Sequence, residues 1–153
     1  MTIAVLTTKE CPDLARTTGR WRWEAFFRDR SPSEVLDREN GTAKSPDLMP
    51  TVLVLLDQQR PIGMVTLCLD DLDGRPLLNP WLAGLYVDPA HRGNGHGHRL
   101  INELEAFASR ERIKRLSLYT SNAVSLYAGV GWRTIETVEL KGKTYFIMQK
   151  HLG

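Results

Sequence analysis

Three alternating glycines follow an arginine at residues 92–97, RGNGHG. Glycine has no Cβ and adopts positive φ readily, so this spacing lets the backbone turn successive N–H groups toward one point. Arg92 adds a full positive charge on a planar fork that suits a phosphate group. The loop therefore predicts a site for a phosphate or pyrophosphate, although the glycines alone would also fit a tight turn without a ligand.

The segments on either side of this loop are predicted to be a buried strand and an amphipathic helix. Before the loop, Leu82, Leu85, Tyr86 and Val87 form an apolar run that Asp88 stops. A helix N-terminus presents unpaired N–H donors and about half an elementary positive charge, so a helix behind the loop strengthens the case for an anion. After the loop, apolar residues recur at helical spacing and polar residues such as Glu105 are expected to face outward; the apolar positions are Leu100, Ile101, Leu104, Phe107 and Ala108.

Two common phosphate-binding loops do not match this stretch. A Walker loop ends in Gly-Lys followed by Ser or Thr, whereas this loop ends in Gly97-His98-Arg99 and has no hydroxyl for magnesium. A dinucleotide-binding loop has the spacing G-x-G-x-x-G and an acidic residue about 20 positions later, at the end of the next strand. Here the third glycine comes one residue early, and the next expected strand ends in Tyr119 and Thr120. Neither class of loop is therefore indicated.

The run that begins at Leu85, LYVDPAHRGNGHG, resembles the acetyl-CoA signature R-x-x-G-x-G/A of the GNAT superfamily of N-acetyltransferases. Residues 122–132, NAVSLYAGVGW, are similar to a later pattern of the family, with Tyr127 in place and Ser125 and Leu126 as departures. The resemblance is strongest over residues 81–132. It implies an α/β (α+β) fold with a mixed, largely antiparallel central sheet flanked by helices, in which a splayed strand pair binds CoA.

The same resemblance implies that acetyl-CoA is the acetyl donor. A backbone N–H of the strand at residues 85–87 would polarise the thioester carbonyl, a contribution of about 3 kcal/mol for one such donor. Tyr127 matches the family tyrosine that protonates the departing thiolate, although a tyrosine here would also fit as a packed core residue. The implied cofactor-binding residues are Leu85, Tyr86, Val87, Arg92, Gly93, Asn94, Gly95, His96, Gly97, Asn122 and Tyr127.

The acceptor implied by the family is a primary amine that attacks the thioester directly in a ternary complex. Trp23 and Phe27 are typical of helix packing, yet the first two helices of GNAT proteins also form part of the acceptor pocket. Asp70, Asp71 and Asp73 fit a solvated turn, but their carboxylates would also attract a cationic amine. A small-molecule amine is favoured, and a protein amine (N-terminal or lysine) or a non-catalytic acyl-CoA sensor are the alternatives.

The general base is left open by the sequence. Many relatives carry a glutamate near the start of the acetyl-CoA strand, where this chain has WLAG at residues 81–84. The candidates are a carboxylate of the acidic loop, Glu24, Glu139, or water that carries the proton to bulk solvent. None of them is favoured by its position in the sequence.

Length and composition favour one domain that spans residues 1–153. The net charge is only +2 and the basic residues lie among acidic ones, so neither nucleic acid nor a membrane is expected as a partner. No apolar run has the length of a signal-peptide core or a membrane span, which predicts a cytoplasmic protein. A monomer or a homodimer is expected. Cys11 and Cys68 are expected to be free thiols, and no metal is expected, because His91, His96 and His98 lack metal-site spacing.

Periodicity and turn residues place the remaining elements. Helices are expected at residues 12–30, 32–40 and 123–129, the second capped by Ser31 and the third by Ser121 and Asn122. Gly19 weakens the prediction of the first helix, and Gly41 is expected to end the second. Strands are expected at 3–6, 51–56, 61–69, 115–120, 134–140 and 144–150.

Overall fold

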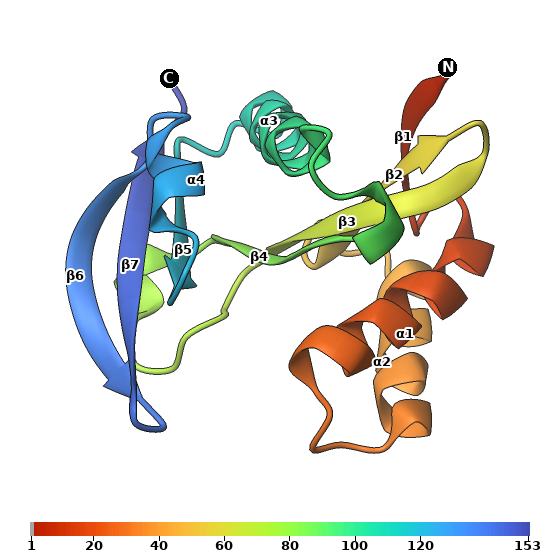
Figure 1. Ribbon diagram of the computed structural model, residues 1–153, viewed down its shortest axis with the longest axis horizontal. Coiled ribbons are helices and arrows are strands. Elements are labelled where there is room, and N and C mark those ends of the chain that lie inside the picture. The colour runs from red at the N-terminus through yellow and green to blue at the C-terminus, as the bar shows by residue number, and fades with distance from the viewer. Residues whose placement is uncertain (1) are drawn as a thin grey trace.

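Seven strands form one sheet in the computed structural model, which describes residues 2–153 (Figure 1). Their order is β1-β2-β3-β4-β5-β7-β6, and every neighbouring pair is antiparallel except β4 and β5, which are parallel. This is the mixed, largely antiparallel sheet that the sequence predicts. The strands are β1 (Ile3–Thr7), β2 (Thr51–Asp57), β3 (Arg60–Cys68), β4 (Trp81–Val87), β5 (Arg115–Thr120), β6 (Arg133–Leu140) and β7 (Lys143–His151).

Helices cover both faces of the sheet. α3 (His96–Arg110) lies on one face, whereas α1 (Ala15–Phe26) and α2 (Pro32–Lys44) pack together on the other (Figure 1). α3 also joins β4 to the parallel β5, as in the expected β-α-β unit. The short α4 (Val124–Ala128) follows β5, and single turns of 3-10 helix lie at Pro12–Leu14, Pro76–Leu78 and Pro89–His91. No helix within residues 2–153 has the length and apolar character needed to cross a bilayer.

The side chains of β2 explain why the core has two parts. Leu53 and Leu55 belong to the cluster that includes Leu104 of α3, whereas Val52 and Val54 belong to a second cluster with Trp21 of α1. Successive side chains of a strand point to opposite faces of the sheet. The uninterrupted apolar sequence of β2 is therefore required by a sheet that is covered on both faces.

The first helix is shorter than predicted, since α1 begins at Ala15 after a turn of 3-10 helix. α1 ends at Phe26 and not at residue 30, and the indole N–H of Trp23 donates to the carbonyl of Arg30 at 2.8 Å across the loop that follows. Gly19 is buried inside α1, and a Cβ at this position would lie 3.2 Å from Cδ1 of Leu36 in α2. The glycine therefore permits a close approach of the two helices, and this packing offsets its low helix propensity.

The second helix begins as predicted but ends later. Ser31 caps α2, since its Oγ accepts a hydrogen bond from the backbone N–H of Glu34 at 3.2 Å. The helix continues through Gly41 to Lys44, and Ala43 beyond the glycine is buried. Burial of the last turn therefore outweighs the cost of about 1 kcal/mol for a glycine in a helix.

The cap predicted for the last helix is wrong. Oγ1 of Thr120 accepts a hydrogen bond from the N–H of Ala123 at 3.1 Å, and neither Ser121 nor Asn122 caps α4. Thr120 therefore binds the residue that precedes α4, and no side chain caps the first turn of the helix itself.

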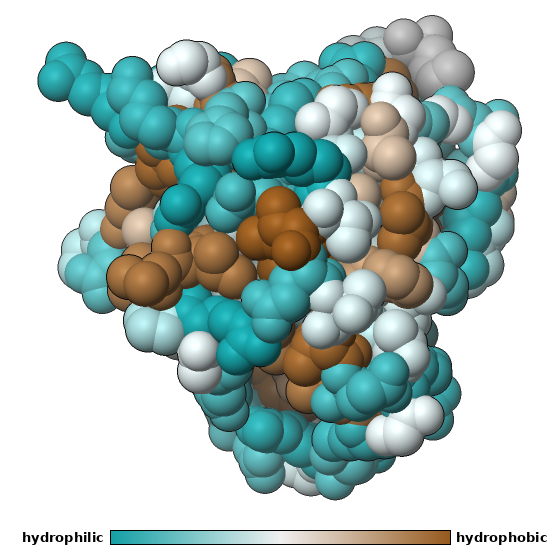
Figure 2. Space-filling view, turned by 90° about the vertical axis from the view of Figure 1, so that its left-hand side faces the viewer, coloured by the Kyte–Doolittle hydropathy of each residue, from teal (hydrophilic) through white to brown (hydrophobic). Residues whose placement is uncertain are grey.

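The edge strand β6 faces solvent over most of its length. Figure 2 shows this side of the molecule, where hydrophilic and hydrophobic residues are mixed on the surface. β6 contributes Arg133, Glu136 and Glu139 to the surface, with Ile135 as its large exposed apolar residue. Charged side chains on an edge strand oppose its pairing with another sheet.

Candidate functional site

The glycine loop at residues 92–97 has the open backbone that its sequence predicts. Gly93 and Gly95 have φ of 82° and 80°, which places both in the left-handed region. A Cβ at Gly93, Gly95 or Gly97 would meet no other atom within 4 Å, so the glycines face open space. Gly95 is the N-cap of α3, no side chain caps this helix, and its first turn holds no acidic residue. The N–H groups of the first turn are therefore available to a bound anion.

Three polar side chains surround this loop. Nε of Arg92 donates to the carbonyl of Val87 at 2.8 Å, and its guanidinium lies 5.4 Å from the ring centre of Tyr86. The Asn94 amide donates to the carbonyls of His91 and Arg92, which holds the loop in its turn. The charge of Arg92 is thus anchored between the end of β4 and the loop, and His96, half-buried, begins α3.

The parallel strands β4 and β5 separate soon after they meet. Trp81 and Ser117 form their one pair in the described part of the chain, and the N–H of Ser117 donates to the carbonyl of Pro80 at 3.1 Å. Along the rest of β4, Leu85, Tyr86 and Val87 have no partner in β5. The expected splay is present, and it leaves the β5-facing backbone groups of β4 free to bind a ligand.

The splayed strands and the glycine loop suit one elongated guest. A pantetheine arm carries amides that can pair with a free strand edge, and a pyrophosphate can accept from the N–H groups at the start of α3. The open space beside all three loop glycines leaves room for close approach of phosphate oxygens. The residues of this chain therefore fit CoA.

Tyr127 lies in α4 with its side chain 6% exposed. Its ring packs edge-on against Trp132, with ring centres 5.9 Å apart. Burial raises the pKa of the Tyr127 hydroxyl to about 12, so the group stays protonated at neutral pH. Asn122, two residues before α4, is exposed. Both residues follow β5 and lie beyond the point where β5 leaves β4.

A partly buried ion pair that the sequence did not indicate lies next to the ring that packs on Tyr127. Glu105 of α3 accepts from the indole N–H of Trp132 at 3.0 Å and from Nζ of Lys150 at 2.6 Å. Nζ of Lys150 also donates to the carbonyl of Val130 at 2.7 Å. The expectation that Glu105 faces solvent is therefore wrong, because Lys150, 45 residues away, and Trp132 bring it partners that helical spacing does not reveal.

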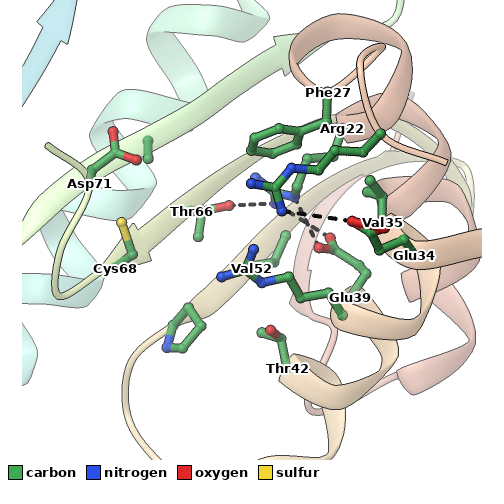
Figure 3. Close-up of a pocket in the computed structure, with 14 residues that line it drawn as sticks. Arg22, Phe27, Glu34, Val35, Glu39, Thr42, Val52, Thr66, Cys68 and Asp71 are labelled. Atoms are coloured by element: carbon green, nitrogen blue, oxygen red, sulfur yellow. Dashed lines mark hydrogen bonds and ion pairs between the residues drawn. The ribbon is translucent and has the colours of Figure 1, made fainter. Parts of the chain in front are cut away.

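A pocket of about 190 Å³ lies between the paired helices and the centre of the sheet. Asp71 and Cys68 stand on one side of it, and Glu34, Val35 and Glu39 of α2 stand on the other (Figure 3). Ala83, just before the irregular part of β4, lines the pocket as well, so the pocket reaches the strand predicted to carry the acetyl group. Other residues that line it include Arg22, Phe27, Arg30, Arg38, Thr42, Val52 and Thr66.

The structure brings two of the five predicted acceptor residues to this pocket, Phe27 and Asp71. Trp23 instead holds the loop after α1 through Arg30. Asp70 accepts a hydrogen bond from the side-chain amide of Asn79, and Asp73 is exposed to solvent. The carboxylates of one acidic loop are thus separated, since adjacent residues of an irregular loop point in different directions.

Asp71 is the candidate base that lines the pocket. Glu24 is exposed and pairs with Arg20, and Glu139 accepts from Thr144 in the β6–β7 hairpin. Burial raises the pKa of the Asp71 carboxyl to about 6, against the opposing effect of nearby Arg22. At neutral pH this carboxyl is ionised and can accept a proton.

Cys68 beside it is a poor nucleophile. Burial and the neighbouring Asp71 carboxylate raise the pKa of its thiol to about 12. The reactive form of cysteine is the thiolate, so this thiol is inert at neutral pH. The expectation that Cys68 is a free thiol is confirmed, as it is for Cys11.

Gly95→Ala is expected to weaken acetyl-CoA binding and to lower the melting temperature. An L-residue in the left-handed region costs roughly 1–2 kcal/mol, and relaxing that strain would turn the loop amides away from the anion. Gly41→Ala is the matched control, because Gly41 lies inside α2, away from the loop, with open space beside it, and alanine favours a helix. Calorimetric titration with acetyl-CoA measures the affinity of each variant, and thermal unfolding measures the melting temperature. Equal loss of affinity in the two variants would contradict a role for the Gly95 backbone.

Sequence comparison identifies an acetyltransferase family model and one curated relative. The chain matches the model of the acetyltransferase (GNAT) family over residues 16–132. It is 30% identical over 118 residues to N-alpha-acetyltransferase 80 of Mus musculus, a match that covers 74% of this chain and 38% of that protein. The chain therefore spans well under half the length of this curated relative.

Solved structures share the fold. An aminoglycoside 6'-N-acetyltransferase complexed with coenzyme A has a TM-score of 0.78 at 14% identity, over 99% of this chain and 97% of that chain. YncA of Salmonella typhimurium, solved with acetyl-CoA, has a TM-score of 0.71 at 19% identity, over 100% and 94% of the two chains. At such identities the likeness establishes the architecture of the sheet and its helices.

Proposed function

Since the chain belongs to the GNAT family of acetyltransferases, we propose that it transfers the acetyl group of acetyl-CoA to a primary amine of a small molecule. The observation that carries this proposal is the pocket of about 190 Å³, which extends from the paired helices to β4 and is lined by a partly buried carboxyl, Asp71. A pocket of this size suits an amine group and the atoms next to it.

The residues that bind the donor are proposed from the geometry of the loop and the strands. The N–H groups of residues 93–97 hold the pyrophosphate, with Arg92 beside them and Asn94 and His96 shaping the loop. The free backbone of Leu85, Tyr86 and Val87 pairs with the pantetheine amides, and Asn122 lies at the open end of the splay. Bound acetyl-CoA supplies an activated thioester, and the chain supplies orientation and proton transfer.

Two side chains move the protons. Asp71 accepts a proton from the acceptor ammonium, which leaves a neutral amine to form the new C–N bond. Tyr127 donates its hydroxyl proton to the sulfur as the C–S bond breaks, and the second proton, which the nitrogen loses as it becomes an amide, passes through solvent and restores the tyrosine. An N–H at the irregular part of β4 polarises the thioester carbonyl in this proposal, a contribution of about 3 kcal/mol. The reaction takes place directly between the two substrates, without an acyl-enzyme.

A second acceptor class has its own support. The relative named N-alpha-acetyltransferase 80 favours the N-terminal amine of a protein as the acceptor. The name of the structural neighbour that acts on aminoglycosides favours a small molecule. Charges of both signs line the pocket, among them Arg30, Arg38 and Asp71, so the first residue of a peptide or a small polar amine would find partners there.

The test is an acetylation screen with mass detection and thiol release as readouts. The protein is incubated with acetyl-CoA and a panel of aminoglycosides, polyamines, amino acids, and peptides with free N-termini or lysines. Acetylation of small amines at a higher kcat/KM than peptides supports the proposal. A preference for peptide N-termini would show that the acceptor is the N-terminal amine of a protein. Tight acetyl-CoA binding without any acetylated product would indicate a sensor module.

A further inference from the structure

We propose that Arg22 is a positioning residue, which fixes the backbone of β4 at Gly84 and keeps the neighbouring Asp71 able to act as the base. This inference rests on the proposed function, because it depends on the role given to Asp71. Arg22 belongs to α1, on the acceptor side of the sheet, whereas Gly84 belongs to the strand that faces the donor. One side chain would therefore couple the two substrate sites.

The guanidinium of Arg22 is held in one orientation. Nε donates to Oε1 of Glu39 at 2.9 Å, and Nη2 donates to Oγ1 of Thr66 in β3 at 2.8 Å (Figure 3). The two charged side chains are only 15% and 5% exposed. Because the guanidinium is planar and both partners are part of packed elements, its third nitrogen has a fixed position as well.

That third nitrogen lies against Gly84. A Cβ at Gly84 would be 2.6 Å from Nη1 of Arg22, closer than side-chain atoms approach. Gly84 has φ of 60° and lies at an irregularity of the ladder, where Thr66 pairs with Ala83 but Met64 pairs with Tyr86. The extra residue makes β4 bulge, and bulges beside active sites turn a strand away from its neighbour. The guanidinium of Arg22 therefore packs directly against the backbone of the bulge, where any side chain larger than that of glycine would displace it.

Arg22 and Asp71 line the same pocket. Burial raises the pKa of this carboxyl to about 6, and the positive charge of Arg22 acts in the opposite direction. Cys68 at the end of β3 and Tyr119 of β5 also lie close, but their pKa values of about 12 leave both neutral at neutral pH. The pocket also holds the charges of Glu34, Arg38 and Glu39 of α2 and of Arg30 in the loop before it, and Asp70 and Asp73 belong to the same loop as Asp71.

The first experiment measures the pKa of Asp71 by carboxyl-carbon NMR in the whole protein without ligands. The double variant Arg22→Met/Glu39→Gln removes both members of the ion pair, so that no buried charge is left alone. We expect the pKa of Asp71 to rise by about one unit in this protein, the lower end of the effect of a neighbouring opposite charge. Glu39→Gln alone keeps the arginine and serves for comparison, since the pKa of Asp71 should not rise in this variant.

A second variant tests the geometry without removing the arginine. In Gly84→Ala the new Cβ requires the guanidinium to move, because the two would be 2.6 Å apart. The pKa of Asp71 should rise in this variant too, and acetyl-CoA should bind more weakly. An Asp71 pKa that is the same in wild type, the double variant and Gly84→Ala would overturn the proposal.

The activity readout separates this inference from the proposed function. With the best acceptor from the screen, the pH at which kcat/KM reaches half its plateau should move upward in the double variant by the same amount as the pKa. A loss of activity at every pH with an unmoved midpoint would mean that Arg22 is merely structural, and would overturn the proposal. If the wild type acetylates no amine, the proposed function fails, whereas the NMR titration still decides whether Arg22 controls Asp71.

Discussion

Replacing Tyr127 with phenylalanine is expected to lower kcat by about 100-fold or more, while the dissociation constant of acetyl-CoA stays within about threefold of the wild type. The phenol is buried and its pKa is raised to about 12, so it is protonated when a thiolate needs a proton. The ring that packs on Trp132 remains in the variant, and the fold should remain as well. Steady-state kinetics and calorimetric titration measure the two quantities.

Tyr145→Phe is the matched control for this variant. Tyr145 lies in β7, where its ring packs on Tyr119, so the substitution removes a phenol hydroxyl from the sheet and not from α4. Its kcat should equal that of the wild type. Tyr119→Phe is a sharper comparison, because Tyr119 lies near Asp71 and its hydroxyl also has a pKa of about 12. A large loss of kcat in Tyr119→Phe, with none in Tyr127→Phe, would show that Tyr119 of β5, and not Tyr127, is the general acid.

Replacing Asp71 with asparagine is expected to lower kcat/KM by about 100- to 1,000-fold at pH 8, because an asparagine side chain cannot accept the ammonium proton. The loss should depend on pH. The pKa of Asp71 is about 6, so the wild type loses its base as the pH falls below that value. Since the acceptor amine ionises alike with both proteins, the ratio of their rates should fall below pH 6 and be flat above it.

The same variant should be more stable than the wild type above pH 6. Burial raises the pKa of Asp71 from its ordinary value of 3.8 to about 6 in the folded protein. Between these values the folded protein holds more protons than the unfolded chain, so the stability of the wild type decreases as the pH rises from about 4 to 6. Asparagine does not ionise. The difference in melting temperature should therefore vanish near pH 4 and reach its full size above pH 6.

Asp73→Asn is the control for Asp71, since it removes one carboxylate from the same loop at an exposed position. We expect its rate and its pH dependence to match those of the wild type. A pH-independent loss of rate in Asp71→Asn, without the gain in melting temperature, would show that Asp71 is not the base. The proton would then pass to water, as it can in an open site.

The donor half of the site was predictable because its signals are local. The spacing of Gly93, Gly95 and Gly97 requires an open loop before a helix, and the backbone angles of Gly93 and Gly95 and the uncapped start of α3 agree with it. The strand pair on either side of α3 follows from apolar runs that the chain carries in order. Resemblance to the GNAT family indicated Tyr127 as the residue expected to protonate the thiolate. The match to the family model over residues 16–132 confirmed the family.

The acceptor half was decided by tertiary structure. Asp70, Asp71 and Asp73 are equivalent in the sequence, yet Asp71 alone among them lines the pocket, because burial depends on how an irregular loop folds over the sheet. Arg22 and Glu39 are 17 residues apart, and Arg22 meets Thr66 and Gly84 only through packing of α1 on the sheet.

The amino-acid sequence by itself thus determined the fold class, the family and the loop proposed to bind the donor, since φ preferences and hydrophobic periods act over a few residues. Only the tertiary structure decided which carboxyl is buried beside a positive charge. The pKa of a side chain depends on solvent exclusion and on charges within a few ångströms, and these come from distant parts of the chain.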